Sequence, residues 1–288
     1  MSAAPANAPS ITARDVALEL HGDRSRRHLA ALAVRDLREG LTLWRLALTL
    51  GWLDIRLRYR GSLLGPFWLT LSTAVMIGAL GLLYGALFHM DVRTYLPFLA
   101  LSQVLWAFLG LLIADACACF TQSEVVIRSV RMPLFVHALR VLVRNLLVLA
   151  HNVVVIVAVD LIFAVSPGVM ALLCLPGIAL WLVDSLAICV LLGAVGARFR
   201  DIPPIVASIT QIAFFITPVM WKPEQLGARV WVLPFNPFFD LLEIVRAPLL
   251  GEMPTATVWG AALGYSAVLL ALSWWLFTRA RGRVPFWI

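Results

Sequence analysis

The stretch DIRLRYRGSLLGPFWLTLSTAVMIGALGLLYGALF, residues Asp54–Phe88, decides the fold of this chain. Three arginines occupy alternate positions near its start: Arg56, Arg58 and Arg60. The chain then breaks at Gly61 and again at Gly65-Pro66, and about twenty uncharged residues follow. A helix of roughly 20 residues crosses the core of a bilayer, and Pro66 suits its first turn, where a missing N–H costs nothing. The sequence therefore predicts a membrane span over Phe67–Phe88, entered from an arginine-rich edge.

The composition extends this prediction to the whole chain. Hydrophobic residues make up 61% of the 288 residues and charged residues 14%, whereas soluble domains average about 45–50% and about 25%. The mean hydropathy is +0.91. The net charge is +7, from 23 basic and 16 acidic residues. The basic residues are 22 arginines and one lysine, and the arginines cluster at the ends of apolar runs. This pattern is typical of membrane orientation and argues against a nucleic-acid partner.

The four cysteines are expected to be small buried hydrophobes, because all of them lie in or beside apolar runs. Cys117-x-Cys119 lacks the second pair of ligands that a zinc site needs, so no metal site is predicted. Residues 1–40 are polar and contain arginines, with no cleavable signal peptide, so we expect the first span to drive insertion.

Upstream of the first span we predict two segments. Residues 1–30 are rich in alanine, proline and serine and then charged, which favours a disordered cytoplasmic N-terminus. Residues 31–60 alternate apolar and basic positions with helical spacing, with Leu37, Trp44, Leu48 and Ile55 on the apolar face. This pattern indicates an amphipathic helix in the membrane interface. An ordinary helix packed on a soluble domain is the alternative, but the chain has no soluble domain of any size.

The remainder, residues 61–288, reads as one all-α membrane domain with six transmembrane helices. Five further apolar runs follow the first span: Tyr95–Phe120, Leu139–Ala164, Val169–Ala197, Ile205–Val219 and Val258–Phe277. The run Ile205–Val219 is short for a full crossing, and an irregular aromatic stretch, Met220–Met253, follows it. We expect that stretch to form short re-entrant or interfacial helices on the outer side.

The distribution of basic residues orients these spans. With both termini in the cytoplasm, 19 of the 23 basic residues fall in inner segments, and four fall in outer ones: Arg93, Lys222, Arg229 and Arg246. The opposite orientation would violate the positive-inside rule at every loop. We therefore predict a multi-pass membrane protein with cytoplasmic N- and C-termini; the resemblance described below implies that the membrane is the bacterial inner membrane.

Ionisable residues inside spans are costly and usually have a reason. Asp115 lies at the same depth as Arg140 and Arg144, which favours an ion pair between two helices over a direct substrate contact. Asp160, near a span end, is expected to reach the interface, and Asp184 is the most deeply placed acid. A phosphate-binding loop needs a Gly-Lys pair, but the only lysine, Lys222, follows Trp221. The chain is therefore not expected to hydrolyse nucleotide by that route.

Two groups of residues have both an ordinary and a functional interpretation. Glu124, Arg128 and Arg131 share one helical face of a short cytoplasmic loop, and this is either a solvated turn or a helix that docks on a cytoplasmic partner. Aromatic residues gather near span ends and form either a lipid-interface belt or a pore lining on which sugar rings stack. The pore candidates are Trp68, Tyr84, Phe88, Trp106, Phe214, Phe215 and Trp221.

Motifs at the span boundaries resemble the permease subunit of type-2 ABC exporters for bacterial surface polysaccharides. The resemblance covers the chain from about Leu41 to its end. Its pieces, in order, are Arg58-Tyr59-Arg60-Gly61-Ser62, Leu64-Gly65-Pro66-Phe67-Trp68, Leu83-Tyr84-Gly85 with Phe88, Arg144-Asn145-Leu146 with His151-Asn152, Arg198-Phe199-Arg200-Asp201-Ile202-Pro203, Thr217-Pro218-Val219-Met220-Trp221, Asn236-Pro237-Phe238 and Glu243-Ile244-Val245-Arg246-Ala247-Pro248. Two of them, the third-span piece and Arg198–Pro203, look more like O-antigen exporters than capsule exporters.

The resemblance implies a homodimeric permease paired with two copies of a separate cytoplasmic ABC ATPase, which would hold ATP and Mg, with no cofactor on this chain. A lipid-linked glycan, carried on undecaprenyl, would pass through a channel between the two permeases. It also implies that the interfacial helix and the Glu124–Arg131 loop contact the ATPase. Arg56, Arg58 and Arg60 then become candidates to bind the lipid pyrophosphate, although a positive-inside anchor explains them equally well.

Gly61, Gly65 and Pro66 would form a hinge through which ATPase motion reaches the first span. Export of capsule, teichoic acid or a small molecule stays open as an alternative within transport. The alternative of another class is an integral membrane enzyme that modifies lipid or glycan. No loop gathers the acids, histidines or metal ligands that such chemistry usually requires.

Overall fold

The structure is a computed structural model that describes residues 26–61, 67–87, 89–166 and 168–288. Every regular element in these ranges is a helix. The α-helices are α2 (Arg26–Thr42), α3 (Trp44–Arg58), α4 (Phe67–Leu87), α5 (Val92–Cys117), α6 (Glu124–Ser129), α7 (Leu134–Phe163), α8 (Cys174–Arg198), α9 (Ile202–Ile216), α10 (Pro237–Leu249), α11 (Ala256–Ala280) and α12 (Val284–Trp287). Three 3-10 helices join them: η1 (Thr121–Ser123), η2 (Gly168–Leu173) and η3 (Pro223–Phe235).

The predicted all-α membrane architecture is confirmed in its main lines. Among the described residues, five helices are long and apolar enough to cross a membrane: Phe67–Leu87, Val92–Cys117, Leu134–Phe163, Gly168–Arg198 and Ala256–Ala280. The helix Leu134–Phe163 starts five residues before the predicted span. The fifth predicted span, Ile205–Val219, corresponds to α9, which has only 15 residues. At 1.5 Å per residue α9 is about 22 Å long, shorter than the ~30 Å apolar core of a bilayer.

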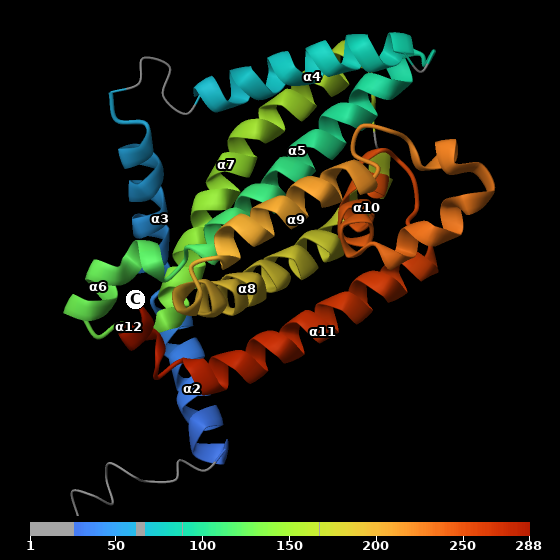
Figure 1. Cartoon of the computed structure of the whole chain (residues 1–288). Helices are drawn as coiled ribbons and strands as arrows, with labels where there is room; N and C mark the ends of the chain where they lie inside the picture. Colours follow the sequence, from blue (N-terminus) through green and yellow to red (C-terminus); the bar gives the residue numbers. More distant parts are fainter. Residues whose placement is uncertain (1–25, 62–66, 88, 167) are drawn as a thin grey trace, which may run out of the picture.

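The long helices form a bundle around α5, which packs against α4, α7, α8 and α9. In Figure 1 these helices run side by side, while α2 and α3 cross one end of the bundle together with α6 and α12. The segments η3 and α10 lie toward the opposite end. Close helix contact needs small residues: a Cβ added at Gly196 of α8 would lie 2.2 Å from the Cys117 carbonyl oxygen of α5. All four cysteines are buried, as expected.

The N-terminal region differs from the prediction in two respects. Residues 26–30 belong to α2 instead of a disordered tail, and residues 1–25 lie outside the described residues. The single helix predicted over 31–60 is two helices, α2 and α3, which meet at Leu43. Leu43 has φ −88° and ψ 19°, which interrupts helical geometry for one residue. The two helices still follow one another across the end of the bundle (Figure 1).

The stretch Met220–Met253 forms short helices, η3 and α10. That they are re-entrant or interfacial and lie on the outer side stays a prediction. The helix α10 packs against α5, α8 and α11, and its Arg246 is buried. The Arg246 guanidinium donates to Ser102 Oγ at 2.9 Å and to the Pro218 carbonyl, and it also pairs with Glu243. The sequence analysis counts Arg246 among the basic residues of the outer segments. In the structure it is buried and links α10 to α5 and to the segment after α9.

Candidate functional site

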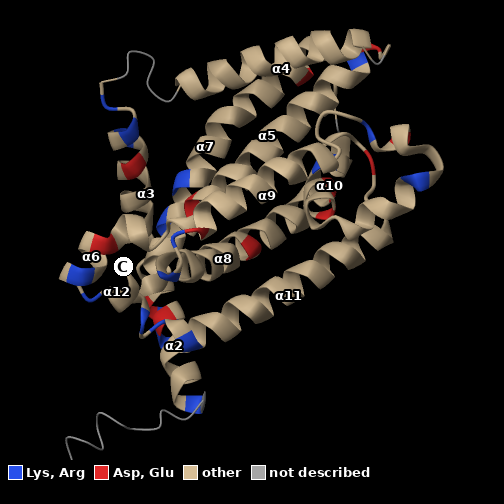
Figure 2. Cartoon of the chain, in the orientation of Figure 1, with Lys and Arg blue, Asp and Glu red and all other residues tan. Residues whose placement is uncertain are grey.

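Charged residues gather at the end of the bundle where α2, α3, α6 and α12 lie, which we call the arginine-rich end. Figure 2 shows basic and acidic residues, as blue and red ribbon, concentrated there, with a smaller group near α10. Among the described residues, the predicted inner arginines of α6, α8, α11 and α3 all belong to this end. The arginines that the positive-inside rule assigns to the inner side therefore lie together at one end of the folded chain.

The helix α3 packs against α7 through its small residues. Ala47 and Gly51 are buried, and a Cβ added at Gly51 would lie 2.7 Å from a methyl of Val143 on α7. The large apolar residues Trp44, Leu48 and Trp52 point outward and are between 42% and 55% exposed. The face predicted to be apolar is therefore divided, with Ile55 against the bundle and the tryptophans on the outside. This arrangement suits a helix that rests on lipid with its outer side.

A buried ionic network fastens α3 to the bundle. Arg140 of α7 donates from Nε to Asp54 Oδ2 at 2.7 Å and from Nη2 to Oδ1 at 2.5 Å. One turn further along α7, Arg144 Nη2 lies 2.8 Å from Asp115 Oδ2 of α5, and Asn145 donates to the same oxygen at 3.0 Å. Arg144 Nη1 also lies 3.6 Å from Asp54. Two arginines and two aspartates thus form a charge-balanced chain across three helices.

This network corrects and extends the sequence prediction. The pairing of Asp115 with Arg144 is confirmed, but Arg140 pairs with Asp54 and not with Asp115. Asp54 was missed because it lies on a separate helix, 86 positions before Arg140. The sequence does show that Asp54 is an acid between arginines on a predicted interfacial helix. An acid that faces an apolar surface needs a cation nearby, which could have pointed to an ion pair.

A second buried acid, Asp36, joins three elements at the arginine-rich end. It is 2% exposed and accepts the backbone N–H groups of Leu134 and Phe135 at the start of α7. Arg281, just beyond α11, donates to it from Nε at 2.7 Å. Asp36 therefore caps α7, where a negative charge is favourable at a helix N-terminus. The sequence analysis did not single out this residue.

The arginine cluster Arg56, Arg58 and Arg60 is exposed at and beyond the end of α3. No ion pair involves these residues within the part of the chain that the structure describes. Their guanidinium groups are therefore available to an anion, and they also complement the negative end of the α3 dipole. Gly61 follows with φ +85°, a left-handed conformation that favours glycine. Gly65 and Pro66, the other predicted hinge residues, lie outside the described residues.

The predicted docking loop forms a projecting helix, α6 (Figure 1). Glu124 and Arg128 share one face and form an i,i+4 ion pair at 3.2 Å. Arg131, predicted on that face, lies beyond the end of α6 at Ser129. Val125 is 80% exposed, although it is apolar and lies outside the spans. The helix rests on α12, because Arg128 donates to the Ile288 carbonyl.

The structure distributes the predicted channel aromatics over different environments. Trp68 of α4 and Phe215 of α9 are 56% and 60% exposed. Trp106 is buried, with its ring centroid 5.6 Å from that of Phe214 and 5.5 Å from that of Phe238. Tyr84 and Trp221 are half-buried, and Phe88 lies outside the described residues. Among the candidates that the structure describes, Trp68 and Phe215 have the most exposed surface.

Comparison with known proteins identifies one family and two curated relatives. The ABC-2 type transporter family matches residues 45–250. The chain is 24% identical over 221 residues to the O-antigen export system permease protein RfbA of Myxococcus xanthus, covering 75% of this chain and 85% of that protein. It is 18% identical over 191 residues to the protein of the same name from Klebsiella pneumoniae, covering 66% of this chain and 74% of that protein.

Proposed function

Because the chain belongs to the ABC-2 type transporter family, we propose that it is the membrane-spanning permease subunit of an ATP-driven exporter of lipid-linked polysaccharide, with O-antigen as its cargo. The observation that carries this proposal is the arginine-rich end. There, a projecting helix for a partner, an exposed arginine cluster and a buried ionic network lie together on one side of a membrane-spanning bundle.

Energy for export is proposed to come from two copies of a separate cytoplasmic ABC ATPase, which hold ATP and Mg. The helix α6 supports this, because its exposed Val125 and its ordered Glu124–Arg128 pair suit insertion into a groove of a soluble partner. The buried pair Asp54–Arg140 would pass a displacement of α3 to α7, since the two helices pack through small residues along their contact. The arginine-rich end would then face the cytoplasm of a bacterial inner membrane, with both termini on that side.

The cargo proposal rests on the two curated relatives, which are named as O-antigen export permeases. A glycan on an undecaprenyl carrier presents a pyrophosphate at the inner membrane surface. The exposed forks of Arg56, Arg58 and Arg60 suit phosphate oxygens, which arginine binds through two parallel hydrogen bonds. Capsule, teichoic acid or a small molecule is the alternative cargo.

We propose that two copies of the chain enclose the channel. Support comes from α9, whose Ile205, Ile209, Ile212 and Phe215 are all at least half exposed in the single chain. With 15 residues, α9 is also shorter than the roughly 20 residues that a helix needs to span the bilayer. The exposed aromatic residues Trp68 and Phe215 would then offer flat faces on which sugar rings stack.

Reconstitution tests the division of labour between the subunits. The purified chain in lipid nanodiscs is expected to hydrolyse no ATP, and hydrolysis is expected when the partner ATPase is added. Robust hydrolysis by the chain alone would contradict the proposal. In cells, depletion of the chain should leave lipid-linked O-antigen on the cytoplasmic leaflet and remove O-antigen from the surface. Loss of capsule or teichoic acid, with O-antigen intact, would favour the alternative cargo.

A further inference from the structure

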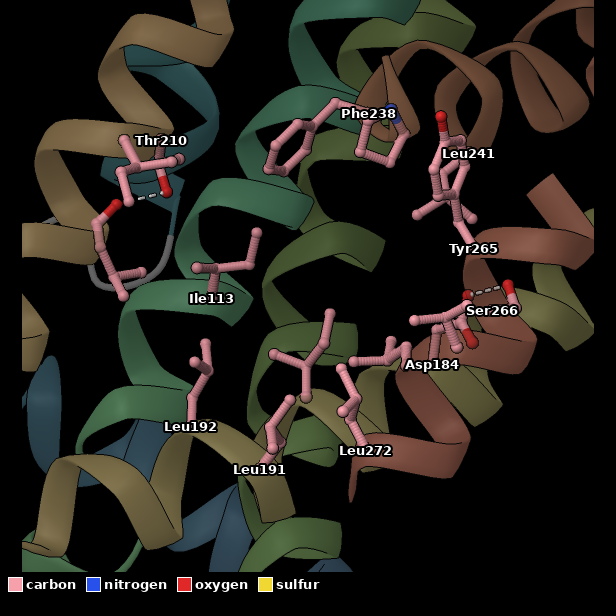
Figure 3. Close-up of a pocket in the computed structure, with 16 residues that line it drawn as sticks. Ile113, Asp184, Leu191, Leu192, Thr210, Phe238, Leu241, Tyr265, Ser266 and Leu272 are labelled. Carbon is pink, nitrogen blue, oxygen red and sulfur yellow. Dashed lines mark hydrogen bonds between the residues drawn. The ribbon is translucent and has the colours of Figure 1, made fainter. Parts of the chain in front are cut away.

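Two of the cavities in this chain have similar volumes but different linings. The cavity between α9 and α11 has a volume of about 370 Å³, and its walls are mostly hydrocarbon, including Leu191 and Leu272 (Figure 3). The Ser266 hydroxyl in its wall donates a hydrogen bond to Asp184. The second cavity, of about 400 Å³, lies at the arginine-rich end and is lined by charged as well as apolar side chains. Of the two, the second has the groups that would select a charged ligand.

Three segments that are far apart in the sequence enclose this second cavity, which we call the basic pocket. The helix α2 contributes Arg35, Asp36 and Glu39, the loop between α6 and α7 contributes Arg131, and the turn between α11 and α12 contributes Arg281. Figure 2 shows basic and acidic residues close together where α2 meets the end of α11. These five residues lie outside the helices that are long enough to span a membrane. A water-soluble molecule or a lipid headgroup can therefore reach them.

The basic pocket has an excess of positive charge. Its three arginines outnumber its two acids, Asp36 and Glu39, which leaves a net charge of +1. Glu39 forms an ion pair with Arg35 at 3.1 Å. Both oxygens of Asp36 accept hydrogen bonds, from the start of α7 and from Arg281. Arg131 is exposed and has no ion pair among the described residues, so its charge is the one left without a partner.

The donors that could hold an anion are accessible. Arg281 bonds Asp36 through Nε alone, so Nη1 and Nη2 have no partner within the described part of the chain. Neither of these nitrogens is buried, and the Arg281 side chain is 25% exposed. Because the buried Asp36 holds the guanidinium in place, little side-chain freedom remains to be lost when a ligand binds. Arg131 offers a second complete guanidinium from a different wall of the pocket.

We propose that the basic pocket binds a phosphate monoester, with the phosphate held by Arg131 and Arg281 and a small organic group against Val130 and Pro285. Arginine binds phosphate oxygens through paired hydrogen bonds. A phosphate monoester presents three terminal oxygens and a charge of about −1.5 to −2 near neutral pH, which suits two guanidinium groups. A carboxylate presents two oxygens and a single charge, so it suits them less well.

This phosphate chemistry has two sources, the headgroup of a lipid phosphate monoester at the membrane surface and a free phosphate ester in solution. The pocket has room for on the order of a dozen non-hydrogen atoms, if each takes the ~30 Å³ of a liquid water molecule. That is enough for a phosphate with a glycerol-sized group from either source. None of Arg56, Arg58 and Arg60 lines the pocket, so this site is separate from the cluster proposed to bind the lipid pyrophosphate. It also does not depend on the cargo of the exporter.

Isothermal titration calorimetry of the full-length chain in phosphatidylcholine nanodiscs tests the proposal. The probe is glycerol 3-phosphate, and glycerol and glycerate are the comparisons. We expect saturable binding of glycerol 3-phosphate, at least tenfold weaker binding of glycerate and no binding of glycerol. Equal affinity for glycerate and glycerol 3-phosphate would overturn the proposal and assign the pocket to a carboxylate, such as an acidic side chain of a protein partner.

The lipid composition of the nanodiscs distinguishes the two sources. Phosphatidic acid carries a phosphate monoester, whereas phosphatidylglycerol is also anionic but carries a phosphodiester. If the lipid headgroup occupies the pocket, phosphatidic acid should weaken the binding of glycerol 3-phosphate at least tenfold more than phosphatidylglycerol does. Equal affinities in the two kinds of nanodisc would assign the pocket to a soluble phosphate ester. Both results require the pocket to bind phosphate.

Variants of the arginines show whether the probe occupies this pocket. Arg131→Gln should weaken binding of glycerol 3-phosphate at least tenfold and leave the fold intact, because Arg131 is exposed and unpaired among the described residues. Arg281→Lys keeps a cation for Asp36 but removes the fork, and it should weaken binding at least fivefold.

Arg283→Gln is the matched control. It removes the same charge two positions from Arg281, at an exposed residue that does not line the pocket, and it should change the affinity less than twofold. Absence of saturable binding in every kind of nanodisc would overturn the proposal. Equal weakening by Arg131→Gln and Arg283→Gln would also overturn it, because the probe would then respond to the general charge of the arginine-rich end. Since Arg131 makes no structural contact that its replacement would break, the test stays decisive even if Arg281→Lys fails to fold.

Discussion

Asp54 on α3 and Arg140 on α7 are joined by two parallel hydrogen bonds, at 2.7 Å and 2.5 Å, although 86 positions separate them in the chain. The pair is largely removed from solvent, with side-chain exposures of 12% and 21%. A two-pronged contact between a planar guanidinium and a carboxylate fixes orientation as well as distance. It therefore makes α3 and α7 move as one body, and α3 is the helix that carries the exposed arginine cluster.

The first prediction concerns this pair. Asp54→Ala should lower the free energy of unfolding by about 3 kcal/mol, because it leaves the Arg140 charge buried without its main partner. The reversed pair, Asp54→Arg with Arg140→Asp, should recover part of that loss and part of the ATPase-coupled export. The double-mutant cycle consists of the unmodified chain, Asp54→Arg, Arg140→Asp and the doubly reversed chain. Each is measured by thermal unfolding in detergent and by an export assay.

The matched control for this cycle is Glu39→Gln, which breaks the Arg35–Glu39 ion pair on α2. Both of these side chains are more than half exposed, at 68% and 52%. Exposed pairs contribute roughly 0–1 kcal/mol, so the control should change stability by less than about 0.5 kcal/mol. Purely additive losses in the Asp54 and Arg140 variants would show that the two helices are not coupled through this contact.

The second prediction separates the two roles open to Arg56, Arg58 and Arg60. Replacement of all three by lysine keeps the positive charge but removes the planar fork that grips two phosphate oxygens. If the cluster binds the lipid pyrophosphate, the lysine variant should export at least tenfold more slowly, with unchanged membrane orientation. If the cluster is only a topological anchor, the lysine variant should be fully active.

Cysteine accessibility of the loops reports the orientation of these variants, and pulse-labelled glycan export reports their rate. The control is Arg45→Lys on the same α3 helix, where the guanidinium lies 5.4 Å from the Trp44 ring centroid instead of at the helix end. This variant should retain both orientation and export.

The third prediction concerns partner docking by α6. Val125→Asp places a charge at a position that is 80% exposed in the single chain, so it should not disturb the fold. Within the docked complex the same charge would be buried, and binding of the ATPase should weaken at least tenfold. Pull-down of the ATPase and stimulated hydrolysis measure this effect.

Val169→Asp provides the comparison for this variant, because Val169 is 83% exposed in η2, a different segment of the chain. It should leave ATPase binding unchanged. Equal weakening by both substitutions, or by neither, would contradict a docking role for α6.

The fourth prediction concerns Gly61 as a hinge. Its φ of +85° costs a residue with a Cβ about 1–2 kcal/mol, although no atom of the described residues lies within 4 Å of an added Cβ. Gly61→Ala should therefore reduce export without steric damage, and Gly61→Asn should be milder, because asparagine tolerates this conformation. Gly78→Ala is the control, since Gly78 lies within α4 with open space around its Cα. Normal export by Gly61→Ala would refute the hinge.

The fifth prediction concerns pH and Asp240 of α10, which lies outside the membrane spans. Burial raises the pKa of Asp240 to about 7, and the nearby Glu243 charge adds to the shift. The residue is fully buried, and neither carboxyl oxygen has a partner among the described residues. The folded chain therefore holds the proton that the unfolded chain releases near pH 4.

Because the folded pKa is the higher one, stability is fully present below about pH 4 and falls as the pH rises toward about 7. Each pKa unit is worth about 1.4 kcal/mol of stability. The unmodified chain should therefore lose a few kcal/mol of its free energy of unfolding between these pH values, and Asp240→Asn should not show this loss. Melting temperatures of both proteins from pH 5 to pH 8 measure it. Parallel pH profiles would contradict a protonated Asp240.

Much of the architecture could be predicted from the sequence. Long uncharged runs, glycine-proline breaks and arginines at span ends are local properties, and they suffice to predict an all-helical membrane protein with a short α9 and short helices after it. The pairing of Asp115 with Arg144 could also be inferred, because depth in the membrane restricts which charges can meet.

The interactions that organise the candidate site could not be inferred in the same way. The partner of Arg140, the capping role of Asp36 and the burial of Arg246 depend on which helix faces which, and helical periodicity fixes a face but not its neighbour. The same limit applied to α3, where small residues contact the bundle and tryptophans point outward, and to the division of the 31–60 region at Leu43.

The sequence by itself thus determined that this chain lies in a membrane, roughly where its apolar helices lie and that arginines gather at their ends, because hydrocarbon excludes charge residue by residue. Only the tertiary structure decided that Asp54 fastens α3 to α7 and that one buried oxygen of Asp184 has no hydrogen-bond partner among the described residues. Both depend on helix packing at close range, where hydrogen-bond geometry over a few ångströms distinguishes a satisfied carboxylate from an orphaned one.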